Sequence, residues 1–531
     1  MSAANCIREP PNGRLDYLWH LARRHTAWQK VPGTFPGKVP GTLASEGFMI
    51  QLIERQFVRT TRPLYGHLVS LLESAISRGD LPSGSRVPPE RELAQRLQIS
   101  RTTVVSAYRE LESRGLLRGY VGRGTFVCAA PDPTGAPFAW RGKIAAAALR
   151  SSDSTLRDTI RHSSDARVLS LAAGEPAIDC FPIEAFQHAI DHVIKRERLA
   201  VWRHGPTEGQ PALREAIAER FGVPAESVLV LAGAQQGLDL LARCLIDPGD
   251  AVIVDRPGYL GAIQSFNAAG AKLIGWDVAK ADMDELEDVL VRYRPKLIYT
   301  NPTFQNPTGV TMPIRARREL LRLAERYRVP IVEDATYREL YFHEAPPPLR
   351  ELDAQNIVIY LNSFSKVLAP GLRLGWLSAA PSIVDQIAII KQRLDPHTQN
   401  LVQFAMARLI RDGNFDTHLR TLRAEHARRC SMMMTSIQRH VPPGALRFAR
   451  PQGGLYLWCR LPAGVSSRAL LDQALAAGVA FVPGHAFYPD PAGESELRLC
   501  FSSVLPNAID DAVRRLAECL ARALPVRSVA I

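Results

Sequence analysis

A hydrophobic repeat with a helical period begins after Pro63. It predicts a helix that Gly79 is positioned to cap, with an apolar face formed by Leu64, Leu68, Leu71, Leu72, Ala75 and Ile76. A second, short helix is predicted over 90–97, and Ser100 is a good N-cap for a third helix that runs to about Ser113. The segment LLRGYVGRGTFV then predicts two short strands around a glycine-rich tip. Three helices followed by a β-hairpin predict a winged helix-turn-helix.

The pattern changes from Val168 onward, where short apolar runs alternate with amphipathic stretches. The runs VLVLAG, AVIVD, KLIGWDV, KLIYT, PIVED and IVIYLNS are predicted strands, and ALREAIAERFG and RARRELLRLAERYR are predicted helices. This alternation predicts a doubly wound, mostly parallel α/β sheet. From about Asn400, further helices and the strands LYLWCRLP and ELRLCFS predict a small C-terminal α+β lobe.

The length of 531 residues suits two or three domains. Residues 1–55 show neither period and are expected to be an extended tail. Met49 is an alternative start of translation, in which case the preceding residues would not belong to the protein. We expect a DNA-binding head over 56–128, a linker over 129–165 and an effector domain over 166–531.

Composition indicates a globular protein, with 46% hydrophobic and 22% charged residues. No window of about 18 uninterrupted apolar residues predicts a membrane span, and the N-terminus lacks the apolar segment of a secretory signal. The eight cysteines are scattered without a CxxC pair, so neither a disulfide framework nor a zinc site is predicted. We expect a cytoplasmic protein with reduced thiols and no metal.

Charge is concentrated at the N-terminal end of the chain. Residues 1–127 carry a net charge of +8, out of +12 for the whole chain. A basic quarter on a nearly neutral body favours an anionic partner, most simply nucleic acid. On charge alone, a solvated basic surface is an equal alternative.

The predicted third helix has the composition of a DNA-reading helix. In a helix-turn-helix this helix enters the major groove with its N-terminal residues at base edges; here those residues are Ser100, Arg101, Thr102 and Thr103, followed by Ser106 and Tyr108. Arg101 can contact guanine through two hydrogen bonds. Arg91 is placed to touch a phosphate. Arg123, at the hairpin tip, is placed to enter the minor groove or hold the backbone.

The run LPSGSRVPPERELAQRLQISRTTVVSAYRELESRGLLRGYVGRGTFV resembles the DNA-binding domain of the GntR family. Its LPSG, ERELA, SRTTV, AYREL and wing segments match that domain in order. The resemblance implies a double-stranded DNA operator as partner. Each arginine taken singly could equally be an ordinary surface residue.

The second region holds the groups that pyridoxal 5′-phosphate requires, which are an amine, an acid at the pyridine nitrogen and an anion cradle. Lys366 lies in SFSKVLAPGLRLGW just after a predicted strand, where open α/β sheets place their sites. Asp334 ends the strand PIVED, and LAGAQQGLDL passes through Gly233 into a helix whose backbone amides can bind an anion. Taken singly, a strand-end aspartate or a lysine is more often structural.

Together and in this order, these motifs resemble fold-type I aminotransferases over residues 166–525. The resemblance implies that Lys366 holds the cofactor covalently and Asp334 pairs with its pyridine nitrogen. Tyr337 and Asn306 would hydrogen-bond the ring oxygen, and Tyr259 would stack on the ring. A phosphate cup would be formed by Ala234, Gln235, Ser363, Ser365 and Arg373.

Arg498, in ELRLCFSS, matches the residue that clamps a substrate carboxylate in this family. Two positions depart from the family pattern. Ala234 stands where a hydroxyl residue often helps to hold the phosphate. His204 stands where relatives commonly have a tyrosine that reaches the neighbouring subunit's cofactor, which puts efficient catalysis in doubt.

A GntR-type head followed by an aminotransferase-like body is the arrangement of the MocR subfamily of bacterial regulators. That resemblance implies a homodimer that binds pyridoxal phosphate and senses an amino compound or a vitamin B6 vitamer. A ligand amine that displaced Lys366, or filled the Arg498 site, would change lobe packing and reach the DNA heads through the linkers. Two alternatives stay open: a working aminotransferase with a secondary DNA-binding head, and a cofactor-binding scaffold with neither activity.

Overall fold

The computed structural model describes Ile53, Glu54, Phe57 and residues 64–78, 80–81, 84–120, 124–128, 165 and 167–524. Contacts divide the chain into two compact units, Met1–Ile144 and Ala145–Ile531, and each is described by itself. Gly79, Arg123 and nearly all of the predicted tail and linker lie outside the described residues.

The described residues of the first unit include the helices α2 (Leu64–Arg78), α3 (Glu90–Leu97) and α4 (Arg101–Ser113), followed by a hairpin of β1 (Leu117–Tyr120) and β2 (Gly124–Val127). Strands β1 and β2 pair antiparallel. The side chain of Ser100 caps α4 by accepting a hydrogen bond from the N–H of Thr103 at 3.1 Å. Gln98 takes the left-handed conformation between α3 and α4, with φ at 50°, and so makes the turn tight. The predicted winged helix-turn-helix is confirmed.

The periodic apolar residues of the three helices form one core. Leu68, Leu72, Leu93, Val104 and Leu111 are completely buried in it. Burial of a leucine side chain stabilises a fold by roughly 1.5–3 kcal/mol, so these residues make a large favourable contribution to the stability of the first unit.

The second unit is built on a seven-stranded sheet in the order β4-β10-β9-β8-β7-β5-β6. Its strands are β4 (Val228–Leu231), β5 (Ala251–Asp255), β6 (Lys272–Trp276), β7 (Leu297–Thr300), β8 (Ile331–Asp334), β9 (Val358–Ser363) and β10 (Gly375–Ser378). Strand β10 is antiparallel to both of its neighbours, and the other adjacent pairs are parallel. The α/β prediction with a mostly parallel sheet is confirmed, with β10 as an unpredicted addition.

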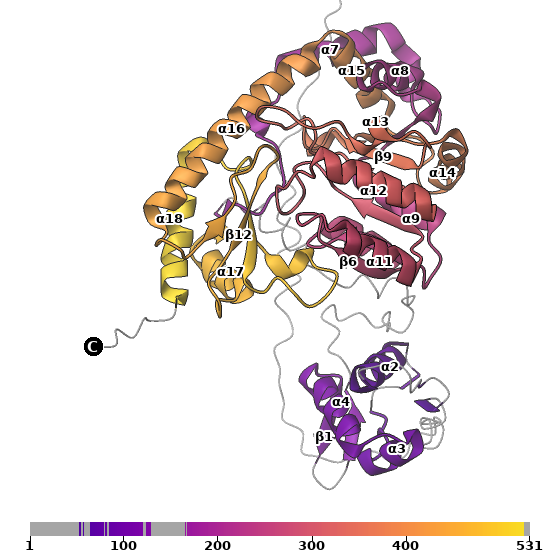
Figure 1. The fold of residues 1–531 in the computed structure, drawn as a ribbon, viewed down its shortest axis with the longest axis vertical. Helices are drawn as coiled ribbons and strands as arrows, with labels where there is room; N and C mark the ends of the chain where they lie inside the picture. Colours follow the sequence, from indigo (N-terminus) through magenta and orange to yellow (C-terminus); the bar gives the residue numbers. More distant parts are fainter. Residues whose placement is uncertain are drawn as a thin grey trace, which may run out of the picture. The chain divides into compact units, whose positions relative to one another are not determined.

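Helices cover both faces of this sheet (Figure 1). Leu229 and Leu231 face a core shared with α9 (Ala234–Leu245), α10 (Leu260–Ala268) and α14 (Pro381–Leu394). Val228 and Val230, which alternate with them, face a core shared with α8 (Pro211–Phe221) and α15 (Asn400–Arg411). On the same side, α11 (Met283–Tyr293) and α12 (Ile314–Tyr327) cover the strands nearer β6. Apart from the edge strand β6, the strands are therefore buried on both faces, which explains their continuous apolar runs.

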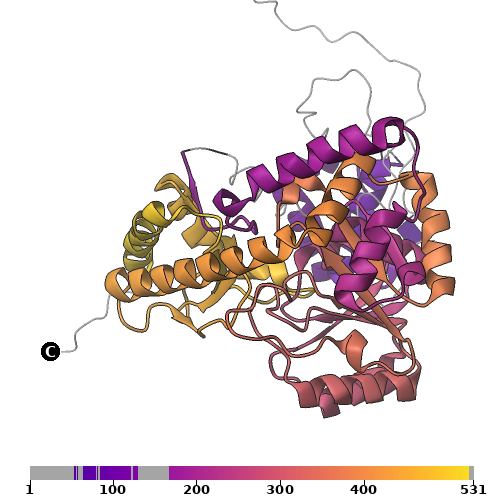
Figure 2. The ribbon, with the colours of Figure 1, turned by 90° about the horizontal axis from the view of Figure 1, so that it is seen from above.

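The smaller lobe is an antiparallel sheet in the order β11-β12-β15-β14. Its strands are β11 (Arg447–Phe448), β12 (Tyr456–Arg460), β14 (Val482–Pro483) and β15 (Glu496–Cys500), and its helices are α17 (Ser467–Ala476) and α18 (Pro506–Ala523). Figures 1 and 2 show the long helix α16 (Asn414–His440) beside α18. Leu419 of α16 is buried in the large-lobe core and Met433 in the small-lobe core, so α16 joins the two lobes.

Two segments belong to a different lobe from the one their position in the chain suggests. Helix α15, predicted as the start of the smaller lobe, packs instead against α7 (Ile183–Glu197) and α8 of the large lobe. Conversely, β3 (Leu169–Ser170) pairs with β13 (Val479–Ala480), so the beginning of the second unit is attached to the smaller lobe.

Short helices complete the connections: η2 (Ile178–Cys180), η3 (Arg198–Trp202), η4 (Ala225–Ser227), α13 (Leu349–Leu352), η5 (Pro370–Leu372) and η6 (Gly484–Phe487). No helix in the described part of the chain is long and apolar enough to cross a membrane.

Candidate cofactor site and nucleic-acid interface

A cavity of about 110 Å³ lies where β8 and β9 end and α9 begins. Its lining consists of Ala234, Gln235, Tyr259, Asp334, Thr336, Tyr337, Ser363, Ser365, Lys366, Pro370 and Arg373. The carboxyl ends of parallel strands open on one edge of a sheet, and ligands of open α/β sheets bind along that edge. The structure thus brings together nearly all of the predicted cofactor residues, although they span 140 positions of the chain from Ala234 to Arg373.

Lys366 supplies the amine of this cavity. Its Nζ donates a hydrogen bond to the carbonyl oxygen of Gly174 at 2.5 Å. Burial and the nearby positive charge of Arg498 lower the pKa of Lys366 to about 8. The amine is therefore partly neutral near pH 7, and a neutral amine is a nucleophile.

The pKa of Lys366 predicts how pyridoxal phosphate capture depends on pH. We expect the capture rate of cofactor-free protein to rise with pH up to about 8 and to level off above it, since only the neutral amine reacts. Stopped-flow absorbance at a series of pH values measures this rate, with N-acetyl-lysine as the unburied control. A capture rate that keeps rising up to about pH 10, near the ordinary pKa of lysine, would contradict the lowered pKa of Lys366.

Asp334 supplies the acid. Its Oδ2 accepts a hydrogen bond from the hydroxyl of Tyr299 at 2.8 Å, and its Oδ1 accepts from the hydroxyl of Thr336 at 2.6 Å. Burial raises the pKa of Asp334, while these two hydrogen bonds and the charge of Lys366 oppose that rise. A positively charged N–H group beside this carboxylate would offset the free-energy cost of burying its negative charge.

Arg498 and three hydroxyl or amide side chains form a second polar group beside Lys366. Asn306 donates through Nδ2 to the hydroxyl of Tyr337 at 3.1 Å, and this hydroxyl also hydrogen-bonds that of Tyr456 at 3.1 Å. Arg498 donates to Asn306 Oδ1 and to the carbonyl oxygen of Ala172, both at 2.8 Å. The Nε of Arg498 is buried and has no hydrogen-bond partner among the described residues. Asn306 and Arg498 thus join the cavity through Tyr337, although neither is part of its lining.

Another part of the cavity lining has the groups that an anion cradle requires. Gly233 has φ at 99°, a conformation that favours glycine, and lets the chain turn from β4 into α9 with Ala234 as its first residue. Arg373 donates to the carbonyl oxygen of Ala232 at 2.9 Å, and the hydroxyl of Ser363 lies 3.0 Å from that of Ser365. The first N–H groups of α9 have no partner within the helix and can bind an anion.

Gln235 and Tyr259 hold each other at the side of this cradle. The hydroxyl of Tyr259 donates to Oε1 of Gln235 at 3.1 Å. The amide of Gln235 in turn donates to the hydroxyl of Ser265 in α10 at 2.9 Å. This pair fixes the phenol ring at the wall of the cavity.

His204 lies outside the cavity. It is exposed and lines a separate hollow of about 640 Å³ together with Val201, Trp202, Arg203, His397, Gln399, Asn400 and Leu401. Within one chain, His204 is therefore not among the residues that line the candidate cofactor cavity.

Several residues of the site were not predicted. Tyr299 and Thr336 position Asp334, and Tyr456 stacks on Arg498 with its ring 4.1 Å from the guanidinium carbon. Asn301 donates to the carbonyl oxygen of Asp334 at 2.5 Å and accepts from the N–H of Asn306. Asn301 and Thr336 stand inside the NPTFQNPTG and DATY motifs, which were available signals, whereas Tyr299 and Tyr456 lie in strands and resemble core residues.

In the first unit, the predicted DNA-reading residues lie at the start of α4. Arg101 and Thr102 are exposed, and Thr103 is half-buried with its hydroxyl 2.8 Å from that of Ser100. Arg101 makes an ion pair with Glu90 of α3 at 3.1 Å. Arg91 is exposed on α3. The side chains at the start of α4 are available to the major groove of DNA, and Arg91 is available to its phosphate backbone, as the helix-turn-helix geometry requires.

Tyr108 does not belong to this surface. It is 3% exposed, and its hydroxyl donates to the carbonyl oxygen of Pro88 at 2.8 Å. It is buried with Val104, Ala107 and Leu111 of α4 in the core of the first unit, so its inclusion in the recognition stretch was wrong.

Two family models match the chain. The model of bacterial regulatory proteins of the gntR family matches residues 64–127, and the model of aminotransferase class I and II matches residues 166–516.

Similar proteins include both regulators and enzymes. The probable rhizopine catabolism regulatory protein MocR of Rhizobium meliloti is 30% identical over 86% of this chain and 93% of its own length. The 2-aminoadipate transaminase of Thermus thermophilus is 38% identical over 72% of this chain and 98% of its own length. Among solved structures, LysN, an α-aminoadipate aminotransferase of Thermus thermophilus in complex with N-(5′-phosphopyridoxyl)-L-leucine, aligns with a TM-score of 0.69 and 37% identity, covering 72% of this chain and 98% of LysN.

These matches and the geometry define a gntR-type winged helix-turn-helix followed by a domain of the aminotransferase class I and II fold. The similarity to MocR extends over most of the length of both chains. The chain belongs to the MocR subfamily of GntR-type regulators.

Aminotransferases of class I and II depend on pyridoxal phosphate, and the cavity fits that group. It offers a buried amine of lowered pKa, a buried carboxylate held by two hydroxyl groups, phenol and amide donors, and a cradle of serines and an arginine at a helix N-terminus. The Nε of Arg498, which has no hydrogen-bond partner among the described residues, is a donor left over for one further acceptor.

Proposed function

We propose that the protein is a DNA-binding transcriptional regulator whose aminotransferase-like body binds pyridoxal phosphate and senses an amino compound or a vitamin B6 vitamer. The observation that carries this proposal is the presence, in one chain, of an exposed recognition helix and a cavity with a complete set of cofactor-binding groups. The protein would act in the cytoplasm as a homodimer, which presents two heads to a double-stranded operator.

In this proposal each side chain of the cavity has one task. Lys366 anchors the cofactor, Asp334 holds the proton at its ring nitrogen, and the cradle of Ser363, Ser365 and Arg373 binds its phosphate. Bound pyridoxal phosphate supplies an electron-withdrawing ring that reacts with amines. Arg498, with its unpaired Nε, binds the carboxylate of an amino-acid effector.

The same donors also hold one segment of the chain. Lys366 donates to the carbonyl oxygen of Gly174, and Arg498 donates to that of Ala172. Attachment of the cofactor would take the amine of Lys366 away from Gly174, and a ligand carboxylate at Arg498 would compete with the hydrogen bond to Ala172.

Residues 172–174 follow β3, which ties the start of the second unit to the smaller lobe, and the predicted linker ends only a few residues earlier. Releasing this segment offers a route from the effector to the head. Such coupling exists only if the ligand binds the released arrangement more tightly than the held one.

A second candidate function is a working aminotransferase. It is favoured by the simultaneous presence of Lys366, Asp334 and Arg498 around one cavity, since transamination requires a lysine to carry protons and an arginine to hold the substrate. His204 at the position of the family's inter-subunit tyrosine weighs against efficient turnover. Steady-state exchange between an amino acid and an oxo acid at ordinary enzyme rates would favour the enzyme.

A gel-shift titration tests the proposal. The full-length protein is titrated on the DNA upstream of its own gene at fixed salt, with and without pyridoxal phosphate and a panel of amino compounds. We expect competitor-resistant binding whose midpoint shifts with one class of amino compound. No specific binding under any condition would refute the regulator.

The role of Arg498 is tested in the same assay. Arg498→Gln is expected to raise the effector concentration needed for the shift by roughly 10- to 100-fold, because a charge-assisted hydrogen bond contributes about 1.5–3 kcal/mol. The matched control is Arg460→Gln in the neighbouring strand, since Arg460 is exposed and pairs with Glu496 at 3.0 Å outside the cavity. Equal responses of the two variants would exclude Arg498 as the carboxylate-binding residue.

A further inference from the structure

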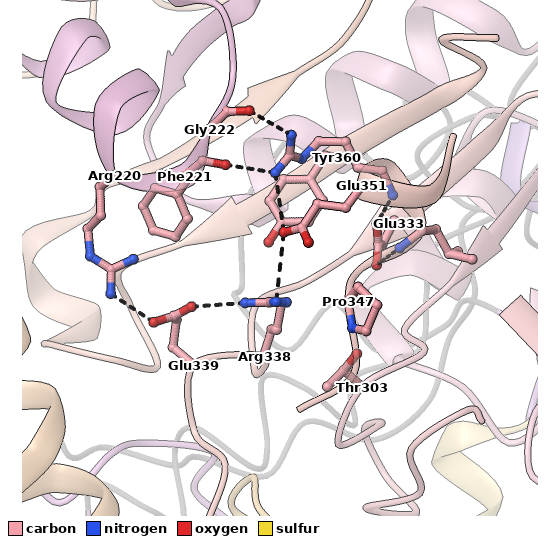
Figure 3. Close-up of polar contacts among 12 residues, drawn as sticks. Arg220, Phe221, Gly222, Thr303, Glu333, Arg338, Glu339, Pro347, Glu351 and Tyr360 are labelled. Atoms are coloured by element: carbon pink, nitrogen blue, oxygen red, sulfur yellow. Dashed lines mark hydrogen bonds and ion pairs between the residues drawn. The ribbon is translucent and has the colours of Figure 1, made fainter. Parts of the chain in front are cut away.

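A buried ion pair lies behind the cofactor site and is not part of its lining. Adjacent residues of a strand point to opposite faces, so Glu333 points away from the cavity that Asp334 lines. Glu333 is 1% exposed, and its nearest cation is Arg317 of α12, which is 0% exposed, with Nη1 at 3.8 Å. The carboxylate also accepts hydrogen bonds from the N–H groups of Leu349 and Arg350, at 2.9 and 3.0 Å (Figure 3).

Arg317 uses its guanidinium to hold one loop at both ends. It donates to the carbonyl oxygen of Pro302 at 2.8 Å and to the hydroxyl of Thr303 at 2.7 Å, where the loop begins. It donates to the carbonyl oxygen of Met312 at 2.9 Å, where the loop ends, and to that of Pro347 at 3.2 Å. Figure 3 shows Thr303 and Pro347 close to Glu333.

This loop carries an amide side chain into the cofactor site. Asn306 lies within it and donates to the hydroxyl of Tyr337. Asn301, just before it, connects Asn306 to the backbone of Asp334. Arg317 therefore acts on Asn306 through the loop, and Glu333 acts on Asp334 through the strand.

Stability alone does not account for this pair. Removing two charges from water is expensive, and well-packed apolar residues in place of a buried ion pair are often neutral or stabilising. Apolar side chains could replace the charge of Arg317 but not its hydrogen bonds. A guanidinium group holds three carbonyl groups and a hydroxyl at fixed distances, which apolar side chains cannot do.

We propose that Arg317 and Glu333 are positioning residues of the cofactor site, which fix Asn306 and Asp334 at two separate atoms of the bound ring. Neither residue touches the cofactor. The inference rests on the proposed binding of pyridoxal phosphate.

The test is the pH at which the visible absorption band of the bound cofactor changes, measured on full-length protein loaded with pyridoxal phosphate. Arg317→Lys removes the guanidinium group that holds the two ends of the loop. Asn306 is then no longer held in position to donate a hydrogen bond to the ring oxygen. An oxygen with fewer donors is more basic, so the midpoint is expected to rise by about half a pH unit or more. Glu333→Gln weakens the placement of Asp334, which in this proposal keeps the ring nitrogen protonated. A ring without that proton withdraws fewer electrons and leaves the titrating group more basic, so the midpoint is expected to shift in the same direction.

Arg214→Lys is the matched control. Arg214 is half-buried and holds the carbonyl oxygens of Val228 and Ala225, at 3.0 and 2.8 Å, away from the cavity. Its lysine variant is expected to lower the melting temperature without moving the midpoint. If Arg317→Lys and Glu333→Gln also lower only the melting temperature, their role is structural and the inference is overturned.

Two further outcomes are distinguishable. If Arg317→Lys does not fold, Thr303→Val removes one of the acceptors of Arg317, and an unchanged midpoint in that variant overturns the inference as well. A wild-type protein without any visible band refutes the proposed cofactor and this inference together, whereas a wild-type band that no variant shifts refutes the inference alone.

Discussion

Lys366→Ala is expected to abolish covalent attachment of pyridoxal phosphate. Lys366 is the lysine of the cavity lining, and burial lowers its pKa to about 8, so its amine is both placed and ready to react. The purified variant should lack the visible absorption band. After borohydride treatment, which makes the attachment permanent, it should show no mass increase for a phosphopyridoxyl group.

Lys391→Met provides a control that is matched in burial and pKa. Lys391 is 0% exposed, and burial lowers its pKa to about 8, yet its Nζ donates to the carbonyl oxygen of Thr207 at 2.7 Å and does not line the cavity. This variant is expected to keep the band and the mass increase. A band that survives in Lys366→Ala would contradict the whole cofactor assignment.

The fold of the head and most of the central sheet could be predicted from the sequence because local signals there agree with tertiary packing. Strands β4, β5, β7, β8 and β9 are almost entirely buried, so each one is a short apolar run bounded by turn residues. In the head, Ser100 caps the helix that its side-chain chemistry predicts.

Strand β10 could not be predicted, because its formation depends on a distant partner. It is four residues long, and its first residue, Gly375, lies so close to the turn between β4 and α9 that an added Cβ would be 2.9 Å from the Cα of Gly233. The hydrophobic pattern also could not predict to which lobe α15 belongs. Such a pattern shows which face of a helix is buried, and not which partner covers it.

Some residues of the cofactor site could likewise be predicted from the sequence, and others could not. Asp334 and Lys366 were found because they follow strands whose ends must meet at one edge of the sheet. Tyr299 and Tyr456 are aromatic residues inside strands, where a core role explains them equally well, and only the hydrogen bonds of their hydroxyl groups show that they serve the site. The role of Gly174 depends on its carbonyl oxygen, which no side-chain pattern reports.

Arg101→Ala is expected to weaken specific DNA binding by about 1–3 kcal/mol, or roughly 5- to 150-fold. Arg101 is the first residue of α4, is exposed, and can turn from Glu90 toward a guanine, where a forked contact to one base supplies this much discrimination. The measurement is a titration on the operator and on a scrambled duplex at one salt concentration, because phosphate contacts alone depend steeply on salt.

Arg114→Ala separates base reading from simple loss of charge. Arg114 follows the same helix at its other end, is similarly exposed, and is held by Glu73 at 2.8 Å and Glu110 at 2.9 Å. Both variants lose one positive charge, so a purely electrostatic contribution would fall about equally on operator and scrambled DNA in both. If Arg101 reads a base, its loss weakens the operator complex far more than the scrambled one, while Arg114→Ala leaves their ratio unchanged. An unchanged ratio in both variants would assign Arg101 to the phosphate backbone and leave recognition to other residues of the head.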